Sequence, residues 1–152
     1  MPSIFHTLWS EVLRPFLQRP KRLQMAALCH RGAAHDTEVL LVTSRGSGRW
    51  IIPKGWPIRG LQASETALQE AWEEAGVRRA TADNRSIGSY CYRKQLSSGL
   101  KIPVETMVYS VAVEDMSDTF PESDQRERQW VSPKRAADLV HETQLKYILR
   151  AF

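Results

Sequence analysis

The sequence has few of the features that hold small secreted proteins together or anchor a chain in a membrane. It contains only two cysteines, Cys29 and Cys91, in separate apolar stretches and outside any C-x-x-C pair, so we expect two buried free thiols in a reducing compartment. No apolar run approaches the ~18 residues of a membrane-spanning helix, and the first ten residues lack the basic start of a signal peptide. These absences favour a cytoplasmic protein without membrane contact.

Histidine is scarce, and the net charge is small. The four histidines are scattered without the spacing of zinc ligands. The net charge of +4 suits a small polyanionic partner, but we expect no stable complex with nucleic acid from so mild an excess. The charge is unevenly distributed, because residues 62–77 contain four glutamates and no Lys or Arg. That segment carries −4 of a chain whose total is +4, which leaves +8 elsewhere and requires an explanation.

The chain begins with an expected helical extension, residues 1–20. Apolar residues between positions 3 and 17 lie at helical spacing on one stripe, and Pro20 ends the pattern. We expect this amphipathic helix to pack on the rest of the chain or on a second copy, which would make a homodimer. A membrane-surface helix is the alternative, although the polar face is not rich in Lys or Arg.

Residues 21–152 are long enough for one domain with its own core. Apolar runs and alternation predict its strands, and Ser97-Ser98-Gly99 between two alternating segments predicts a hairpin. The expected strands are residues 24–31, 38–44, 49–52, 86–94, 102–113 and 129–131, and the expected helices are residues 63–75, 133–140 and 143–151. Strands flanked by helices, with a central hairpin, predict an α/β fold with a mixed sheet between helical layers.

Three glutamates on the expected helix at residues 63–75 form a candidate binding site for a cation. Glu70, Glu73 and Glu74 stand at i, i+3 and i+4, so they share one helix face, where like charges repel. No basic residue on the same helix relieves the repulsion, whereas a divalent cation would. Mg²⁺ prefers oxygen ligands and is typically held by one or two carboxylates together with substrate phosphates. A solvated acidic face is the alternative that these three residues alone leave open.

The surrounding sequence favours the metal. Residues 55–77 read GWPIRGLQASETALQEAWEEAGV and resemble the Nudix box, G-x5-E-x7-R-E-U-x-E-E-x-G-U, where U is a large aliphatic residue. The matching positions are Gly55, Glu70, Glu73, Glu74, Gly76 and Val77. The resemblance implies a Nudix-type α/β/α sandwich over roughly residues 22–150. It also implies a hydrolase that uses Mg²⁺, or Mn²⁺ in its place, to cleave a diphosphate linkage.

Three positions depart from the box. Leu61 replaces the box glutamate, Gln69 replaces the box arginine, and Ala71 replaces a large aliphatic residue. In the family the glutamate and arginine are thought to hold the loop and helix together, and here both are neutral, so neither is left as an unpaired charge. The presumed metal ligands are all retained. An alternative of a different class, a catalytically inactive Nudix-fold binding domain, stays open because of Leu61 and Gln69.

The resemblance assigns a role to each acidic position. Glu73 and Glu74 resemble metal ligands, helped by the main-chain carbonyl of Lys54, and Glu70 resembles a further ligand or the base that deprotonates water. All three glutamates are thus candidate catalytic residues. A further acid after the box often completes the family's metal site. Glu127 is the first candidate for it and Glu122 the second, with a plain surface acid as the alternative for each.

Within the family, the sequence is most similar to the diphosphoinositol polyphosphate phosphohydrolases, in residues 38–45, 49–53, 73–77 and 126–130. Relatives of that group cleave diphosphoinositol phosphates and diadenosine polyphosphates, which are dense polyanions. A Gly/Ser turn flanked by arginines suits phosphate oxygens. The candidate substrate-binding residues are Arg22, Ser44, Arg45, Arg49, Lys54, Gly55, Arg126 and Arg128. Hydrolysis of a nucleoside diphosphate such as an ADP-sugar is the main alternative, and hydrolysis of an RNA 5′ triphosphate is a third.

Overall fold

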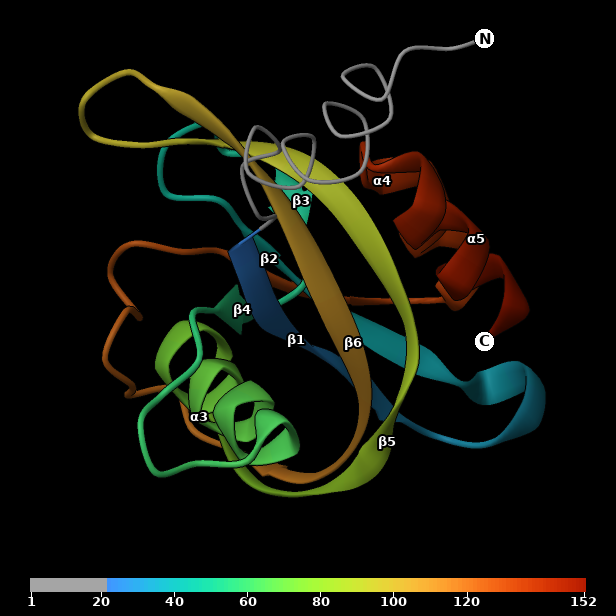
Figure 1. Ribbon diagram of the computed structural model, residues 1–152. Coiled ribbons are helices and arrows are strands. Elements are labelled where there is room, and N and C mark those ends of the chain that lie inside the picture. The colour runs from blue at the N-terminus through green and yellow to red at the C-terminus, as the bar shows by residue number, and fades with distance from the viewer. Residues whose placement is uncertain (1–21) are drawn as a thin grey trace, which may run out of the picture.

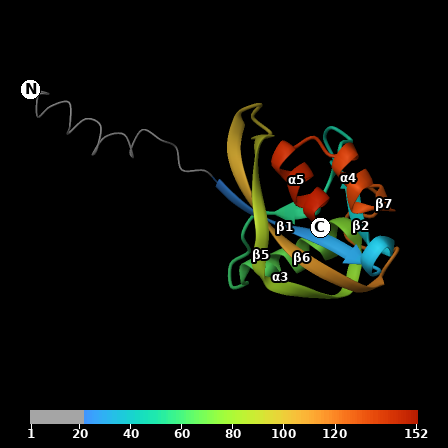
Figure 2. The same cartoon turned by 90° about the vertical axis from the view of Figure 1, so that its right-hand side faces the viewer.

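A mixed β-sheet forms the middle of the protein. The computed structural model describes residues 22–152, so the expected N-terminal helix lies outside the described residues. The sheet has seven strands. Five of them lie side by side in the order β3-β2-β1-β6-β5, and the other two, β4 and β7, pair with β1 and β2 outside this order. Helices cover both faces of the sheet, with α3 on one side and α4 and α5 on the other (Figures 1 and 2). The expected α/β/α sandwich with a mixed sheet is confirmed.

The centre of the sheet is a parallel pair, β1 (Arg22–Arg31) and β6 (Lys101–Met116). Residues 24–29 of β1 are buried without alternation, because helices cover both faces of the sheet at this strand. β2 (Glu38–Thr43) runs antiparallel to β1 and also pairs with β3 (Trp50–Ile51) and β7 (Arg128–Val131). This arrangement brings Thr43, at the end of β2, next to the chain that enters β7.

Two features of the sheet were not predicted. β4 (Lys54–Gly55) pairs with β1 directly after Pro53, and so fixes the loop that carries the first glycine of the box. β5 (Val77–Gln95) begins immediately after the helix, nine residues before the expected strand. The sequence pattern is too polar to signal this part of β5, since an edge strand is held by its backbone pairing with β6 and much of it faces solvent.

The expectation that both cysteines are buried was wrong for one of them. Cys29 lies in β1 and is completely buried, whereas Cys91 lies in the edge strand β5 and is exposed. Side chains alternate between the two faces of a strand, and the neighbouring Tyr90 takes the buried position. Neither cysteine forms a disulfide bond.

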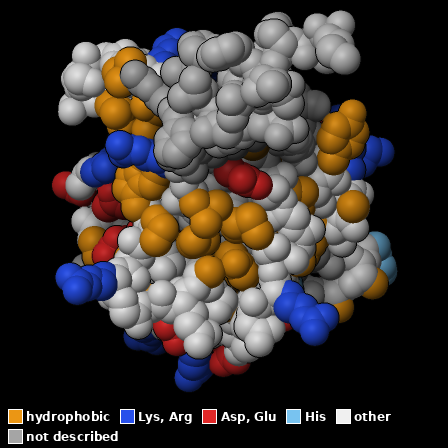
Figure 3. Space-filling view, viewed as in Figure 1, with side chains coloured by type: hydrophobic (Ala, Val, Ile, Leu, Met, Phe, Trp, Pro, Cys, Tyr) orange, Lys and Arg blue, Asp and Glu red, His pale blue; other side chains and the backbone are white. Residues whose placement is uncertain are grey.

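The core has two layers, one on each face of the sheet, and helices cover both. α3 (Ala63–Ala75) has the predicted bounds, and its alanines pack with apolar residues of β1, β2 and β6. α4 (Pro133–Leu139) and α5 (Thr143–Ala151) cover the opposite face around Leu145 and Leu149. Since α3 is short compared with β5 and β6, hydrophobic side chains stay visible near the middle of the face on its side (Figure 3). None of the helices within residues 22–152 has the length and apolar character required to cross a membrane.

Candidate active site

Helix α3 is fixed at both ends, which sets the direction of its glutamates. At the start, the backbone N–H of Gln62 donates to the Glu65 carboxylate at 2.8 Å. At the end, Gly76 takes a left-handed conformation with φ 72°, and its N–H donates to the carbonyl of Trp72. A Cβ at Gly76 would also lie 2.4 Å from the carbonyl oxygen of Ser117, so the chain after α3 requires glycine here. The box sequence therefore specifies the exit from the helix as well as the acidic face.

Gly55 has a different role, because it makes room for a carboxylate. A Cβ built at Gly55 would lie 2.1 Å from Oε1 of Glu70 and 2.7 Å from Oε2. The Glu70 side chain thus rests directly on the backbone of β4, where no other residue type leaves space. This contact explains why a glycine and a glutamate fifteen positions apart occur together in the box.

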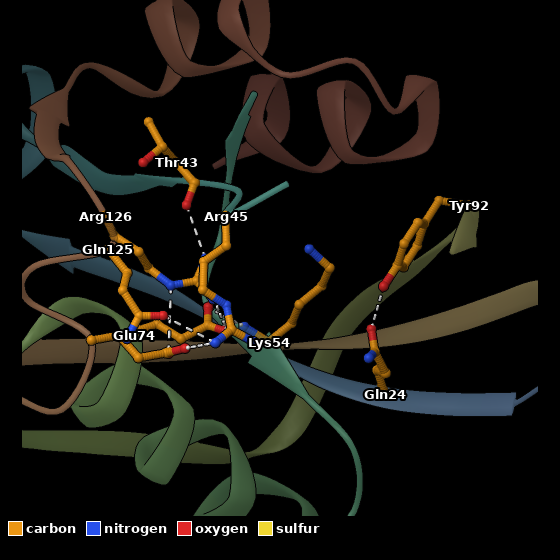
Figure 4. A network of polar contacts seen from close by, with 9 residues as sticks. Gln24, Thr43, Arg45, Lys54, Glu74, Tyr92, Gln125 and Arg126 are labelled. Carbon is orange, nitrogen blue, oxygen red and sulfur yellow. Dashed lines mark hydrogen bonds and ion pairs between the residues drawn. The ribbon is translucent and has the colours of Figure 1, made fainter. Parts of the chain in front are cut away.

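Glu74 is the most buried of the three glutamates, with 7% of the residue exposed. Its Oε2 accepts from the backbone N–H of Lys54 at 3.3 Å, and its Oε1 is 3.0 Å from Nη2 of Arg126 (Figure 4). Burial raises the pKa of Glu74, while Arg126 and Lys54 oppose the shift. Glu74 and the Lys54 backbone are therefore directly hydrogen-bonded, and the role of the Lys54 carbonyl as a metal ligand stays a prediction.

Of the two candidates for a fourth acid, Glu122 is the one that lies beside the helix. Its backbone N–H donates to the carbonyl of Glu73 at 3.0 Å, and its carboxylate is 3.0 Å from Nη1 of Arg45 and 3.4 Å from Nε of Arg126. Glu127 is exposed, and its backbone pairs with Thr43. The sequence offered no signal for this order, since the loop before β7 contains several acids and its path depends on the fold.

The charges in this cluster perturb one another. Burial, followed by the carboxylates of Glu74, Glu73 and Glu122, raises the pKa of Glu70 to about 7. Burial also lowers the pKa of Lys54 to about 8, and the charges of Glu74 and Glu142 partly oppose this shift. Glu70 therefore combines two properties of a general base, a pKa near neutrality and a position among other acids.

The cluster fits the cation that the box implies, although no complete ligand set is assembled within residues 22–152. No group of three Asp, Glu, His or Cys side chains in that range is already placed to hold an ion. Mg²⁺ needs only one or two carboxylates, because waters and phosphates complete its shell. Burial and the neighbouring carboxylates raise the pKa of Glu70, and a cation between α3 and β4 would relieve both effects. The position of Glu70 against Gly55 places its carboxylate between these two elements. Glu70, Glu73 and Glu74 would hold it, with Glu122 within reach.

The arginines predicted to bind substrate lie in different settings. Arg45 has a 58% exposed side chain and reaches from its turn towards the acidic cluster, where it contacts Glu122 and Gln125. Arg126 is 5% exposed and paired with Glu74. Arg128 donates to the carbonyls of Ala75 and Ser117, which places it at the C-terminal end of α3.

The other predicted substrate residues lie on the surface or within turns. Arg22 is exposed at the start of β1, and Arg49 is exposed at the end of the turn that follows β2. In that turn the N–H of Ser44 donates to the carbonyl of Arg49 and the N–H of Gly48 to that of Ser44, so two backbone donors are used internally. The binding roles of these residues stay predictions.

A polar group beyond the glutamates was not predicted from the sequence. The ammonium group of Lys54 lies 5.1 Å from the centre of the Tyr92 ring, and the Tyr92 hydroxyl donates to Gln24 at 2.5 Å (Figure 4). Gln24, on β1, and Tyr92, on β5, are far apart in the sequence, and each was expected to serve only as part of a strand. Lys54 thus contacts Glu74 through its backbone N–H and Tyr92 through its side chain.

Known proteins share this arrangement of loop, helix and sheet. The NUDIX domain family model matches residues 22–152. This chain belongs to the Nudix family. Among curated relatives, Nudix hydrolase 21 (chloroplastic) of Arabidopsis thaliana is 30% identical over 119 residues, which cover 77% of this chain and 57% of that protein. Nudix hydrolase 4 of the same plant is 28% identical over 115 residues, covering 76% and 53%. The chain therefore spans a little over half the length of these relatives.

Solved Nudix structures are similar in fold at low sequence identity. An Ap4A hydrolase of C. elegans in a binary complex has a TM-score of 0.64 and 20% identity, covering 85% of this chain and 93% of that chain. The NUDIX domain of Shewanella oneidensis NrtR, crystallised with ADP ribose, has a TM-score of 0.62 and 15% identity, and each chain is covered to 95%. These likenesses confirm the Nudix fold.

Proposed function

We propose that this Nudix domain is a hydrolase that cleaves a diphosphate linkage with the help of Mg²⁺ or Mn²⁺. The observation that carries the proposal is the cluster of Glu70, Glu73, Glu74 and Glu122 between α3, β4 and the loop before β7. Membership of the Nudix family supports the reaction class, because the curated relatives that match most of this chain are named as hydrolases. An acidic cluster kept only for a solvated surface would not bury Glu74 or raise the pKa of Glu70 to about 7.

The residues divide the work of the reaction. When bound, the cation would neutralise phosphate oxygens and stabilise charge on the leaving group. Glu73 and Glu74 would hold it. The main-chain carbonyl of Lys54 would be a further ligand, and the N–H of the same residue already binds Glu74. Glu70 accepts the proton of the attacking water, which its raised pKa allows near neutral pH. The ammonium group of Lys54 and the guanidinium of Arg45 orient the phosphates, with Arg22, Arg49 and Arg128 as further candidates.

The substrate we propose is a compact polyanion, such as a diphosphoinositol polyphosphate or a dinucleoside polyphosphate. Arg45 is exposed and already leans over the acidic cluster, and the chain outside residues 62–77 carries +8. None of the relatives reported above is named for diphosphoinositol phosphates. The resemblance to the diphosphoinositol polyphosphate phosphohydrolases therefore stays part of the proposal. The Ap4A hydrolase neighbour supports the fold alone, and its substrate enters here as one candidate.

A substrate panel with Mg²⁺ tests this proposal. The panel contains a diphosphoinositol polyphosphate, a diadenosine polyphosphate, an ADP-sugar and a 5′-triphosphorylated RNA, with products identified by phosphate and nucleotide analysis. We expect the first two to have the highest kcat/KM. Cleavage of the ADP-sugar alone would replace the polyanion with a generic nucleoside-diphosphate substrate. Binding of these ligands without cleavage would instead favour the inactive binding domain.

Arg45→Ala separates the substrate classes within one experiment. Arginine contributes more to binding when it contacts more phosphates, so the variant should lose about tenfold in kcat/KM on the polyphosphate and much less on an ADP-sugar. The difference should shrink as the salt concentration rises, because exposed charges are screened. Equal losses on both substrates would contradict the polyanion proposal.

A further inference from the structure

Arg126 is the arginine whose surroundings the sequence reasoning did not anticipate. Its side chain is 5% exposed, and its guanidinium donates from Nη1 to the carbonyl of Thr43 at 2.9 Å and from Nη2 to Glu74 at 3.0 Å. Its Nε lies 3.4 Å from Glu122 and makes no well-directed hydrogen bond. One buried cation therefore joins the end of β2, helix α3 and the loop before β7 (Figure 4). A residue in this position cannot meet substrate at the rim without leaving its present partners.

The guanidinium of Arg126 is bound to the carboxylate of Glu74, which is one of the proposed metal ligands. Both oxygens of Glu74 already accept from N–H donors, one of Arg126 and one of the Lys54 backbone. Helix α3 has no Lys or Arg of its own, and Gln69, at the position of the box arginine, gives Glu73 a neutral donor at 3.0 Å. Within residues 22–152, the Arg126–Glu74 contact is the one ion pair that involves a box glutamate. Positive charge that the helix lacks thus comes from the other side of the site.

A metal ion bound to Glu74 and the guanidinium of Arg126 would be two cations next to one largely buried carboxylate, and they would repel each other. Such repulsion is stronger here than at a surface, since little water separates the charges. Without a metal, the same guanidinium offsets part of the repulsion between Glu74 and Glu122. Arg45 at Glu122 and Lys54 near Glu74 supply the remaining positive charge. The contact therefore stabilises the metal-free protein and opposes the binding of a metal.

We propose that Arg126 is an internal counter-ion, which holds Glu74 while the metal is absent and weakens metal binding until it releases that carboxylate. The inference rests on the proposed metal site and adds a residue that sets how tightly the site binds its cation. Arg126 then acts through Glu74 and is a positioning residue, in place of the substrate contact that the sequence favoured. A purely orienting role predicts the opposite sign, because the loss of an orienting contact would weaken metal binding.

Mn²⁺ binding to the substrate-free protein, followed by electron paramagnetic resonance, tests whether loss of Arg126 strengthens or weakens metal binding. Arg126→Gln should bind Mn²⁺ on the order of tenfold more tightly than the wild type, because one positive charge next to the ligand is gone. The melting temperature of the metal-free variant should fall by roughly 5 °C or more, as expected when a buried ion pair loses one partner. Arg45→Gln is the matched control, since it removes the same charge from Glu122 without touching Glu74, and it should change Mn²⁺ affinity much less.

Two further measurements keep the test decisive if Arg126→Gln does not fold. Arg126→Lys keeps the charge but cannot contact Thr43, Glu74 and Glu122 at once, so it should bind Mn²⁺ slightly more tightly than the wild type. In the wild type, NMR signals of the Arg126 guanidinium, assigned by their loss in Arg126→Lys, should shift when Mg²⁺ is added. Weaker or unchanged Mn²⁺ binding in the Arg126 variants, or unshifted signals, would overturn the counter-ion role. If Glu74→Gln also left Mn²⁺ binding unchanged, the metal site itself would be wrong.

Discussion

The two sides of helix α3 differ in which charged residues of the Nudix box they retain. The side that faces β4 and the loop before β7 carries the three box glutamates that this chain retains. Each is in contact with a specific group: Glu70 with Gly55, Glu73 with Gln69, and Glu74 with Arg126. On the other side, Leu61 and Gln69 line a groove of about 390 Å³ at the positions where the box has a glutamate and an arginine. The rest of its lining is Glu65, Leu68, Trp72, Val77, Arg78 and Ala80.

The comparison teaches that charge is retained on α3 where a partner or a metal uses it and lost where it served only as a pair. A buried charge left without its partner is costly, whereas replacing both members of a pair by neutral groups costs little. Leu61 is 41% exposed in the groove, so its apolar side chain needs no partner there. The site side should therefore be sensitive to a single neutral substitution, and the groove side tolerant.

The largest expected effect is on the site side. Glu73→Gln and Glu74→Gln keep the shape of the side chain and remove its charge, so each should still fold. Glu74→Gln should also lower the melting temperature, because Arg126 loses its partner. Each should lower kcat on the order of 10²-fold or more, the scale of electrostatic and general-base contributions. The matched control is Glu65→Gln, the same change in the groove on the same helix. It should keep nearly full activity, because a glutamine oxygen can still accept from the Gln62 N–H that caps the helix. Equal kinetics for all three variants would remove the distinction between the two sides.

Gly55→Ala tests whether the space beneath Glu70 matters. The added methyl group would overlap the Glu70 carboxylate, so that side chain has to move while the backbone stays in place. We expect a roughly tenfold or larger loss of kcat, in keeping with the cost of misplacing a catalytic group, and weaker Mn²⁺ binding. Gly46→Ala is the control for Mn²⁺ binding, because a Cβ there would meet no atom within 4 Å. Unchanged metal binding in Gly55→Ala would show that Glu70 is free to take another position.

A smaller effect should appear in the stability of the metal-free protein as the pH changes. The pKa of Glu70 is raised to about 7 from an ordinary value of 4.5, so the protonated form is favoured in the folded state. The resulting stabilisation is present below the ordinary pKa and is lost as the pH rises through about 7. The melting temperature of the wild type should therefore fall more between about pH 5 and pH 8 than that of Glu70→Gln. Added Mg²⁺ should reduce the fall, and parallel curves for the two proteins would contradict the shift.

The smallest effect belongs to the groove. Leu61→Glu alone should not raise activity, because position 69 offers the new carboxylate no arginine. The arginine of the groove, Arg78, is already paired with Asp115. Leu61→Glu combined with Gln69→Arg should do better than either single change, by about the coupling energy of a partly exposed ion pair, which corresponds to a few-fold effect at most. Strictly additive effects on kcat/KM in this double-mutant cycle would show that the two positions do not communicate.

Sequence reasoning worked best where the signal is local. The bounds of α3 follow from the apolar spacing of its alanines and from Gly76, and they agree with the structure at every residue. The first part of β5 was missed because its polar residues pair through their backbones at the edge of the sheet. β4 was missed because two residues after a proline give no pattern.

The site was only partly predictable for the same reason. The box places three glutamates on one helix face, and the structure brings two of them, Glu70 and Glu74, to the Lys54–Gly55 backbone. The contact between Arg126 and Glu74 joins residues 52 positions apart, so neither periodicity nor spacing could indicate it. The approach of Glu122 to Glu73 likewise depends on the path of the loop after β6, which no local pattern encodes.

The central claim, a metal-dependent hydrolase site at the end of α3, is tested most directly by removing the metal. The protein is treated with a chelator and dialysed, and hydrolysis of the preferred substrate of the panel is followed before and after Mg²⁺ or Mn²⁺ is added. We predict no hydrolysis by the treated protein, full recovery with either cation in the wild type, and little recovery in Glu74→Gln. Full activity of the metal-free protein, or equal recovery in Glu74→Gln, would contradict the account.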